Sequence, residues 1–119
     1  MKKEIGKPRV YGTTQAETTL IGWGSTYGAI KEAVDQAIKD GLSINLVHLA
    51  EIWPFPVEAT AQAIQGAKRI IAVENNATAQ LAHLLRAETG YQVSGKILKF
   101  DGRPLSPAYI LKQLKAEVR

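Results

Sequence analysis

The sequence contains no cysteine. Disulfide bonds, cysteine-ligated iron–sulfur clusters and zinc sites with thiolate ligands are therefore excluded within this chain. Histidine is also scarce, because only His48 and His83 are present and no carboxylates accompany them at metal-ligand spacing. A protein-bound zinc ion needs three or four such ligands held together. We therefore expect no metal site and no catalytic metal chemistry from these residues.

Long hydrophobic runs and a concentrated excess of one charge are missing as well. No apolar stretch approaches the roughly 20 residues of a membrane span, and the polar, basic start of the chain is unlike a secretory signal. The net charge is +4 over 119 residues, half of it within residues 1–17. A nucleic-acid-binding protein more often gathers its basic residues on one face with aromatic residues between them. We expect a cytoplasmic globular domain that binds neither nucleic acid nor a membrane.

The chain does contain a regular alternation of strand and helix patterns. After a polar arm (1–17) with a strand-like fragment at 9–11, apolar strand patterns occur at 18–21, 44–49, 69–73 and 96–100. Helical apolar stripes occur between them and after the last strand, at 26–40, 57–64, 77–89 and 107–118. This alternation predicts a three-layer α/β/α domain over residues 18–119 with a mostly parallel sheet.

Local signals place the ends of these helices. Gly41, Gly66 and Gly90 each follow a helical stripe and suit the left-handed residue that ends a helix. Ser106 followed by Pro107 is typical of a helix start. The segment "IWPFP" at 52–56 holds two prolines, which excludes a helix interior or a central strand there.

Four unusual stretches each follow the end of an expected strand. They are "GWGST" at 22–26, "AEIWPFP" at 50–56, "ENNAT" at 74–78 and "DGRP" at 101–104. The carboxyl ends of parallel strands meet at one edge of the sheet, which is where such domains bind their partners. We therefore expect one functional face, made by Gly24, Ser25, Thr26, Glu74, Asn75, Asn76, Asp101 and Arg103. Part of this pattern also suits helix capping, for which Asn76 or Thr78 is a good residue.

The glycine loop of "GWGSTYG" (22–28) does not match the common phosphate-binding motifs. Its G-x-G-x-x-x-G spacing is one residue longer than the dinucleotide fingerprint, and no acidic residue ends the second long strand. Lys31 lies a full turn too late for a P-loop, and Ser25 lacks the flanking glycines of a hydrolase nucleophile. We expect Gly28, inside the helix, to allow close packing against the sheet. The pattern favours a face for contacts and indicates no catalytic residue.

The motifs "LIGWGSTYGAIKEAV", "LAEIWPFPVE", "IIAVENNATAQLAHLLR" and "FDGRPLSP", in this order, resemble one known family. They are similar to the C-terminal domain of the alpha subunit of 2-oxoacid:ferredoxin oxidoreductases, which is related to the C-terminal domain of transketolase. The resemblance covers residues 9–119. It implies a five-stranded sheet of order 1-3-2-4-5 whose first strand, at 9–11, is antiparallel, and a basic interdomain linker within 1–17. It also implies a fragment of a longer subunit or a separately encoded domain.

For function, the resemblance implies coenzyme A-dependent oxidative decarboxylation of a 2-oxoacid, such as pyruvate or 2-oxoglutarate, with electron transfer to ferredoxin. Thiamine diphosphate, magnesium and iron–sulfur clusters carry out this chemistry in the complete enzyme. In the family the thiamine site is built by the preceding domain and the beta subunit. This domain would bind no cofactor itself, contact those two partners and be inactive alone. The alternatives are a free-standing nucleotide-binding module and an α/β protein-interaction module.

Overall fold

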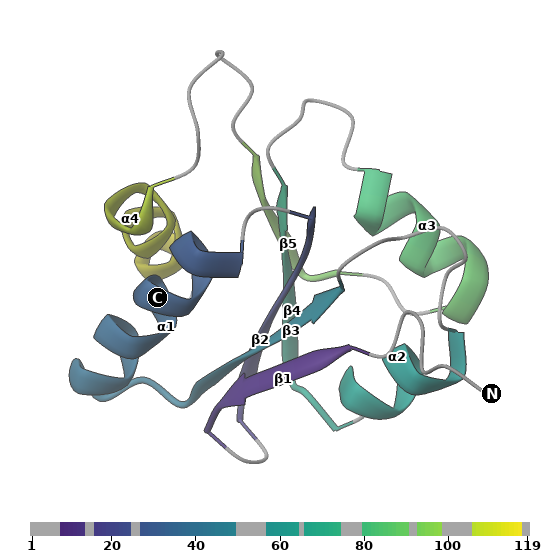
Figure 1. The fold of residues 1–119 in the computed structure, drawn as a ribbon, viewed down its shortest axis with the longest axis horizontal. Helices are drawn as coiled ribbons and strands as arrows, with labels where there is room; N and C mark the ends of the chain where they lie inside the picture. The colour runs from purple at the N-terminus through teal and green to yellow at the C-terminus, as the bar shows by residue number, and fades with distance from the viewer. Residues whose placement is uncertain are drawn as a thin grey trace, which may run out of the picture.

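The computed structural model describes residues 8–13, 16–24, 27–49, 57–64, 66–74, 80–90, 93–98 and 106–117. Strands and helices alternate along the chain after two initial strands (Figure 1). In chain order they are β1 (Arg9–Gly12), β2 (Thr18–Trp23), α1 (Tyr27–Lys39), β3 (Ile44–Leu49), α2 (Val57–Ile64), β4 (Arg69–Glu74), α3 (Gln80–Thr89), β5 (Gly95–Leu98) and α4 (Pro107–Glu117).

The strands form one five-stranded sheet of order β1-β3-β2-β4-β5. Strands β2 to β5 run parallel to their neighbours, whereas β1 pairs antiparallel with β3, with Arg9 opposite His48. The expected order, including the antiparallel first strand, is confirmed. Central strand β2 is buried on both faces, which is why its sequence reads as a nearly continuous apolar run.

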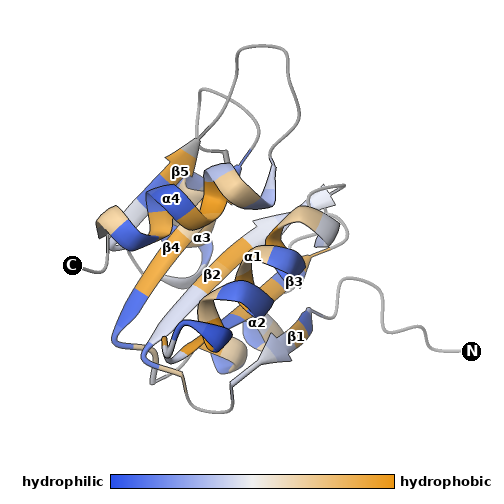
Figure 2. Cartoon of the chain, turned by 90° about the vertical axis from the view of Figure 1, so that its left-hand side faces the viewer, coloured by the Kyte–Doolittle hydropathy of each residue, from blue (hydrophilic) through white to orange (hydrophobic). Residues whose placement is uncertain are grey.

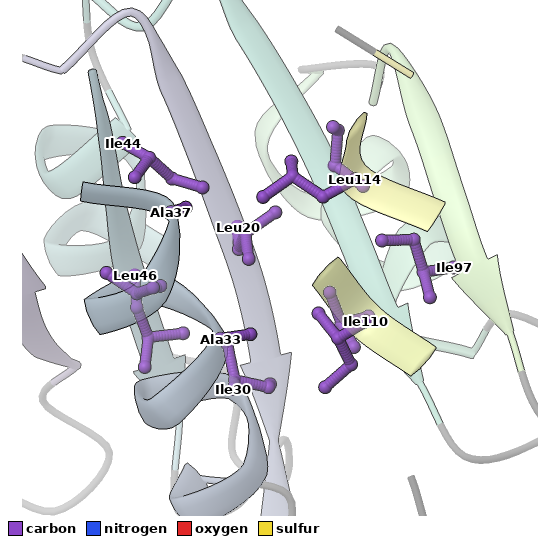
Figure 3. Close-up of a cluster of buried hydrophobic side chains, with 12 residues drawn as sticks. Leu20, Ile30, Ala33, Ala37, Ile44, Leu46, Ile97, Ile110 and Leu114 are labelled. Carbon is purple, nitrogen blue, oxygen red and sulfur yellow. The ribbon is translucent and has the colours of Figure 1, made fainter. Parts of the chain in front are cut away.

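Helices cover both faces of the sheet (Figures 1 and 2). Alternation along β2 divides the core, because Leu20 packs in the cluster under α1 and α4 while Ile21 packs in the cluster under α2 and α3. Figure 3 shows the first cluster, where side chains from the sheet meet those of α1 and α4. Its labelled members are Leu20, Ile30, Ala33, Ala37, Ile44, Leu46, Ile97, Ile110 and Leu114. The three-layer α/β/α architecture is confirmed.

The expected helix ends are confirmed by backbone geometry. The three glycines after α1, α2 and α3 have φ angles of +91°, +89° and +84°, and they are Gly41, Gly66 and Gly90. At the end of α1 the Leu42 N–H also donates to the Ala37 carbonyl at 3.0 Å, as in a Schellman motif. At the start of α4 the Ser106 hydroxyl accepts from the Tyr109 N–H at 3.1 Å, which satisfies one free helix donor.

Three local predictions differ from the structure. Gly28 does not provide close packing: it is exposed, and a Cβ built there would meet nothing within 4 Å. Ile38, expected in the inward stripe of α1, is 38% exposed. Strand β5 covers Gly95–Leu98 instead of 96–100, and the end of the expected strand lies outside the described residues, as does the start of the helix expected at 77. No helix in the described part of the chain has the length and hydropathy needed to cross a membrane.

Candidate functional site

The carboxyl ends of the parallel strands lie along one edge of the sheet, as expected. Gly22 of β2 is in register with His48 of β3 on one side and with Val73 of β4 on the other. Of the eight residues expected on this face, Gly24 and Glu74 lie in the described residues. The other six lie outside them, and they are Ser25, Thr26, Asn75, Asn76, Asp101 and Arg103. The structure thus brings together the ends of β2, β3 and β4 around the two described candidates.

Glu74 is the last residue of β4 and its side chain belongs to the interior of the domain. The residue is 1% exposed, and each carboxylate oxygen accepts a hydrogen bond. The indole N–H of Trp23 donates to Oε1 at 3.3 Å, and the backbone N–H of Ala82 donates to Oε2 at 3.1 Å. Because Ala82 lies in the first turn of α3, the carboxylate also faces the positive end of the helix dipole. Glu74 therefore ties the end of β2 and the start of α3 to β4.

This arrangement changes what Glu74 is expected to do. The sequence placed Glu74 on a face for contacts, and a carboxylate open to water there could be truncated with little effect on the folding of an isolated domain. The side chain is instead buried with protein donors, so its removal leaves the Trp23 and Ala82 N–H groups without this acceptor. An unsatisfied buried donor costs about 1–3 kcal/mol. Glu74 is thus a structural residue of this edge, whatever contacts the edge makes.

Gly24 follows directly after β2 and has a left-handed backbone. Its φ angle is +74°, and a Cβ added at this position would meet nothing within 4 Å. The requirement for glycine therefore comes from the backbone conformation and not from crowding inside the domain. The turn carries the chain away from the carboxyl edge toward α1, which begins at Tyr27.

A second group of side chains gathers at the end of β3. The His48 ring lies 5.1 Å from the Tyr27 ring, centroid to centroid, with an interplanar angle of 68°, which is an edge-on contact. On the same tyrosine, the Arg9 guanidinium carbon lies 4.6 Å from the ring centroid, a cation–π contact. This stack joins β1, β3 and α1 beside Gly24.

His48 is buried, and this environment favours the neutral form of its imidazole ring. Burial, and then the nearby Arg9 guanidinium, lower the pKa of His48, while a hydrogen bond to the Gly24 backbone acts in the opposite direction. Its Nε2 atom is buried and has no hydrogen-bond partner among the described residues. Its burial and its ring contact with Tyr27 are those of a structural residue.

Sequence reasoning did not assign a role to Trp23 or Tyr27. A tryptophan at the end of a buried strand carries an N–H group that needs a partner when the ring is covered. That signal could have suggested a nearby acceptor. It could not have identified Glu74, which lies 51 residues further along the chain.

Among the residues that the structure describes, no group of three or more His, Asp or Glu side chains is placed to hold a metal ion. Glu74 and His48, both at the described part of the edge, make contacts within the domain. The arrangement therefore provides an edge with a left-handed turn at Gly24 and with helix α3, whose first turn donates a hydrogen bond to Glu74.

Residues 16–110 match the family described as pyruvate:ferredoxin oxidoreductase core domain II. The chain is 32% identical over 116 residues to the 2-oxoacid:ferredoxin oxidoreductase subunit alpha of Saccharolobus solfataricus. That match covers 98% of this chain and 18% of the relative, so the chain spans about a fifth of the relative's length.

Solved structures agree with this match. The 2-oxoglutarate:ferredoxin oxidoreductase from Magnetococcus marinus, solved with 2-oxoglutarate, coenzyme A and succinyl-CoA bound, has a TM-score of 0.86 at 30% identity over 94% of this chain and 20% of that one. The alpha chain of a probable 2-oxoacid ferredoxin oxidoreductase from Thermoplasma acidophilum has a TM-score of 0.64 at 35% identity, covering 92% of this chain and 95% of that one. Transketolase from Campylobacter jejuni shares the fold, with a TM-score of 0.69 at 14% identity.

Proposed function

Because the chain belongs to the core domain II family of pyruvate:ferredoxin oxidoreductases, we propose that it works as the alpha-subunit domain of a 2-oxoacid:ferredoxin oxidoreductase. The complete enzyme would decarboxylate a 2-oxoacid oxidatively, transfer the acyl group to coenzyme A and pass electrons to ferredoxin. The observation that carries this proposal is the combined sequence and fold agreement with enzymes named for that reaction. A cytoplasmic location is part of the proposal.

Within that enzyme we assign the domain a non-catalytic role. The chain has no cysteine, so its residues do not fit an iron–sulfur cluster. The described residues also offer no metal-ligand group for a magnesium ion. Glu74 and His48 are buried and engaged inside the domain, which leaves no described acid–base pair free for a substrate. Thiamine diphosphate, magnesium and the clusters would therefore be held by other parts of the enzyme.

We further propose that the carboxyl edge of the sheet meets the thiamine-binding domain of the alpha subunit and the beta subunit. The loops expected to make these contacts carry Ser25, Thr26, Asn75, Asn76, Asp101 and Arg103. They follow strands whose ends the structure holds in a fixed register. Trp23 and Glu74 support that edge from inside the domain.

Viologen dye reduction tests the proposed activity directly. The 119-residue chain would be assayed with pyruvate or 2-oxoglutarate and coenzyme A, first alone and then together with the remaining domains and subunits of the enzyme. We expect turnover only in the assembled enzyme. Turnover by the chain alone would contradict the non-catalytic role, and an assembled enzyme that is equally active without this chain would contradict the proposed function.

A pair of substitutions tests the proposed interface. Arg103→Ala removes a charge from the expected contact face, whereas Lys112→Ala removes one from the exposed surface of α4. We expect the first variant to weaken subunit association and the second to leave it unchanged, with both chains folded. Equal association of the two variants would count against an interface at the position of Arg103.

A further inference from the structure

A groove of about 380 Å³ lies between α3, along Ala82–Arg86, and the segment Val93–Lys96 at the start of β5. Its lining combines apolar and basic side chains with a hydroxyl group, from Ala82, His83, Arg86, Val93, Ser94, Gly95 and Lys96. The N–H of Ser94 donates to the carbonyl of Ile70, the second residue of β4, at 2.6 Å. The groove therefore begins near the amino ends of the strands, and Glu74 lies at the other end of β4.

The charges in this groove differ from those of three other basic side chains on the described surface. Arg86 and Lys96 come from different elements, both are exposed, and no carboxylate among the described residues lines the groove. Elsewhere Lys31, Lys68 and Lys115 each form an ion pair with an aspartate or glutamate. Neither Arg86 nor Lys96 has an ion-pair partner among the described residues, so two positive charges face one groove without internal neutralisation.

Neutral donors add to these charges. The Ser94 hydroxyl oxygen accepts the backbone N–H of Ile70 at 3.2 Å, which leaves the hydroxyl proton available to donate. His83 adds an exposed ring from α3. Arginine, lysine and hydroxyl groups converging on one cavity are the set of donors that binds phosphate oxygens, with the arginine able to form two parallel hydrogen bonds.

We propose that this groove binds a small diphosphate-bearing anion. The volume is in the range of pockets that hold small molecules and exceeds what a single phosphate group needs. Ala82, which is 5% exposed, and Val93 supply apolar surface beside the donors. Two adjacent phosphate groups would face Arg86 and Lys96 together. The site does not rest on the proposed function, since its charged donors, Arg86 and Lys96, lie outside the described part of the carboxyl edge.

The test is a titration of the isotope-labelled 119-residue chain with sodium pyrophosphate, free of divalent cations, followed by amide NMR shifts. We expect saturable shifts for Ala82–Arg86 and Ser94–Lys96 at millimolar concentrations. The variant Arg86→Gln/Lys96→Gln should weaken binding at least about tenfold, because each charged donor contributes strongly to a charge-assisted hydrogen bond. The matched control Lys39→Gln/Lys112→Gln removes the same charge from exposed positions outside the groove. It should change the affinity less than about twofold.

Further arms identify the source of the diphosphate. Tighter binding of adenosine diphosphate than of pyrophosphate would support the site with a nucleotide as its ligand, and equal or weaker binding would support it with a free diphosphate. Equal loss of pyrophosphate binding in both double variants would overturn the proposal, because it would indicate binding to net charge alone. Shifts absent from the groove amides would also overturn it. The amide spectrum of each variant shows independently whether the chain is folded.

Discussion

The two ends of α3 hold charge in opposite ways. At its start the carboxylate of Glu74 is 1% exposed and accepts hydrogen bonds from the Trp23 indole and the Ala82 backbone. In its last turn Arg86 is exposed and, with Lys96, lines a groove that has no carboxylate in the described part of the chain. A buried charge with its donors in place is part of the fold, because removing either side leaves a polar group unpaired. An exposed charge without a partner contributes little to the fold and stays available for a ligand.

The largest expected effect comes from removing the buried charge. Glu74→Ala should lower the free energy of unfolding by about 1–3 kcal/mol, since the N–H groups of Trp23 and Ala82 lose their acceptor. For a domain of this size the melting temperature should fall by roughly 3 °C or more. Thermal unfolding measures this, with the exposed α3 residue Glu88→Ala as the matched control, expected within about 0.5 kcal/mol of the parent chain. If both alanine variants melt together, the buried role of Glu74 is wrong.

The basic groove provides the other half of this comparison. Arg86→Gln/Lys96→Gln should leave the free energy of unfolding within about 0.5 kcal/mol of the parent chain, because exposed unpaired charges stabilise the fold little. The same thermal unfolding experiment measures it. A loss of stability as large as that of Glu74→Ala would mean that the two basic side chains stabilise the fold. The contrast between the two ends of α3 would then be wrong.

Alanine substitutions at two glycines near the start of α1 should change the free energy of unfolding in opposite directions. Gly24→Ala should destabilise the domain by about 1 kcal/mol, because its φ of +74° is unfavourable for any residue with a Cβ. Gly28→Ala lies in α1 with open space around it and should stabilise by up to about 1 kcal/mol. Chemical denaturation measures both changes. If Gly28→Ala instead destabilises the domain, this result would support the close packing at Gly28 that we first expected from the sequence.

The smallest effect concerns pH. The pKa of His48 is lowered in the folded chain, so the unfolded chain binds more protons at this residue. Its contribution to stability is therefore fully present above the unfolded pKa and is lost as the pH falls below it. Between about pH 7.5 and 5.5 the parent chain should lose stability, and His48→Gln should remove that part of the pH dependence. The exposed His83→Gln serves as the control. An unchanged slope in His48→Gln would contradict the burial argument.

Local patterns predicted the elements of this fold well. Helix stops at Gly41, Gly66 and Gly90 depend on neighbouring residues only, and all three adopt the expected left-handed backbone. The strand order followed from the family resemblance, because apolar runs alone do not say which strands are neighbours. The exposure of single helix residues was harder to predict. Gly28 and Ile38 are both more exposed to solvent than we expected from the sequence.

The sequence predicted where candidate residues lie relative to the strands, but not which groups they contact. Strand alternation correctly placed Glu74 and Gly24 at ends of neighbouring strands. It could not show that the Trp23 indole and the first turn of α3 would satisfy the carboxylate, because these partners meet only in the folded domain. The stack of Arg9, Tyr27 and His48 was missed for the same reason, since it joins three elements. Candidates outside the described residues, such as Arg103, stay predictions.

The central claim is that the carboxyl edge of the sheet is the surface that meets the rest of the enzyme. Hydrogen–deuterium exchange tests it most directly, by comparing the isolated chain with the same chain assembled with the proposed partners, a thiamine-binding domain and a beta subunit. We predict slower exchange on assembly in peptides that contain Ser25, Asn75 and Arg103, with no change at residues 41–43 and 66–68 near the amino ends of the strands. Protection confined to residues 41–43 and 66–68, with the carboxyl-edge peptides unchanged, would contradict the claim.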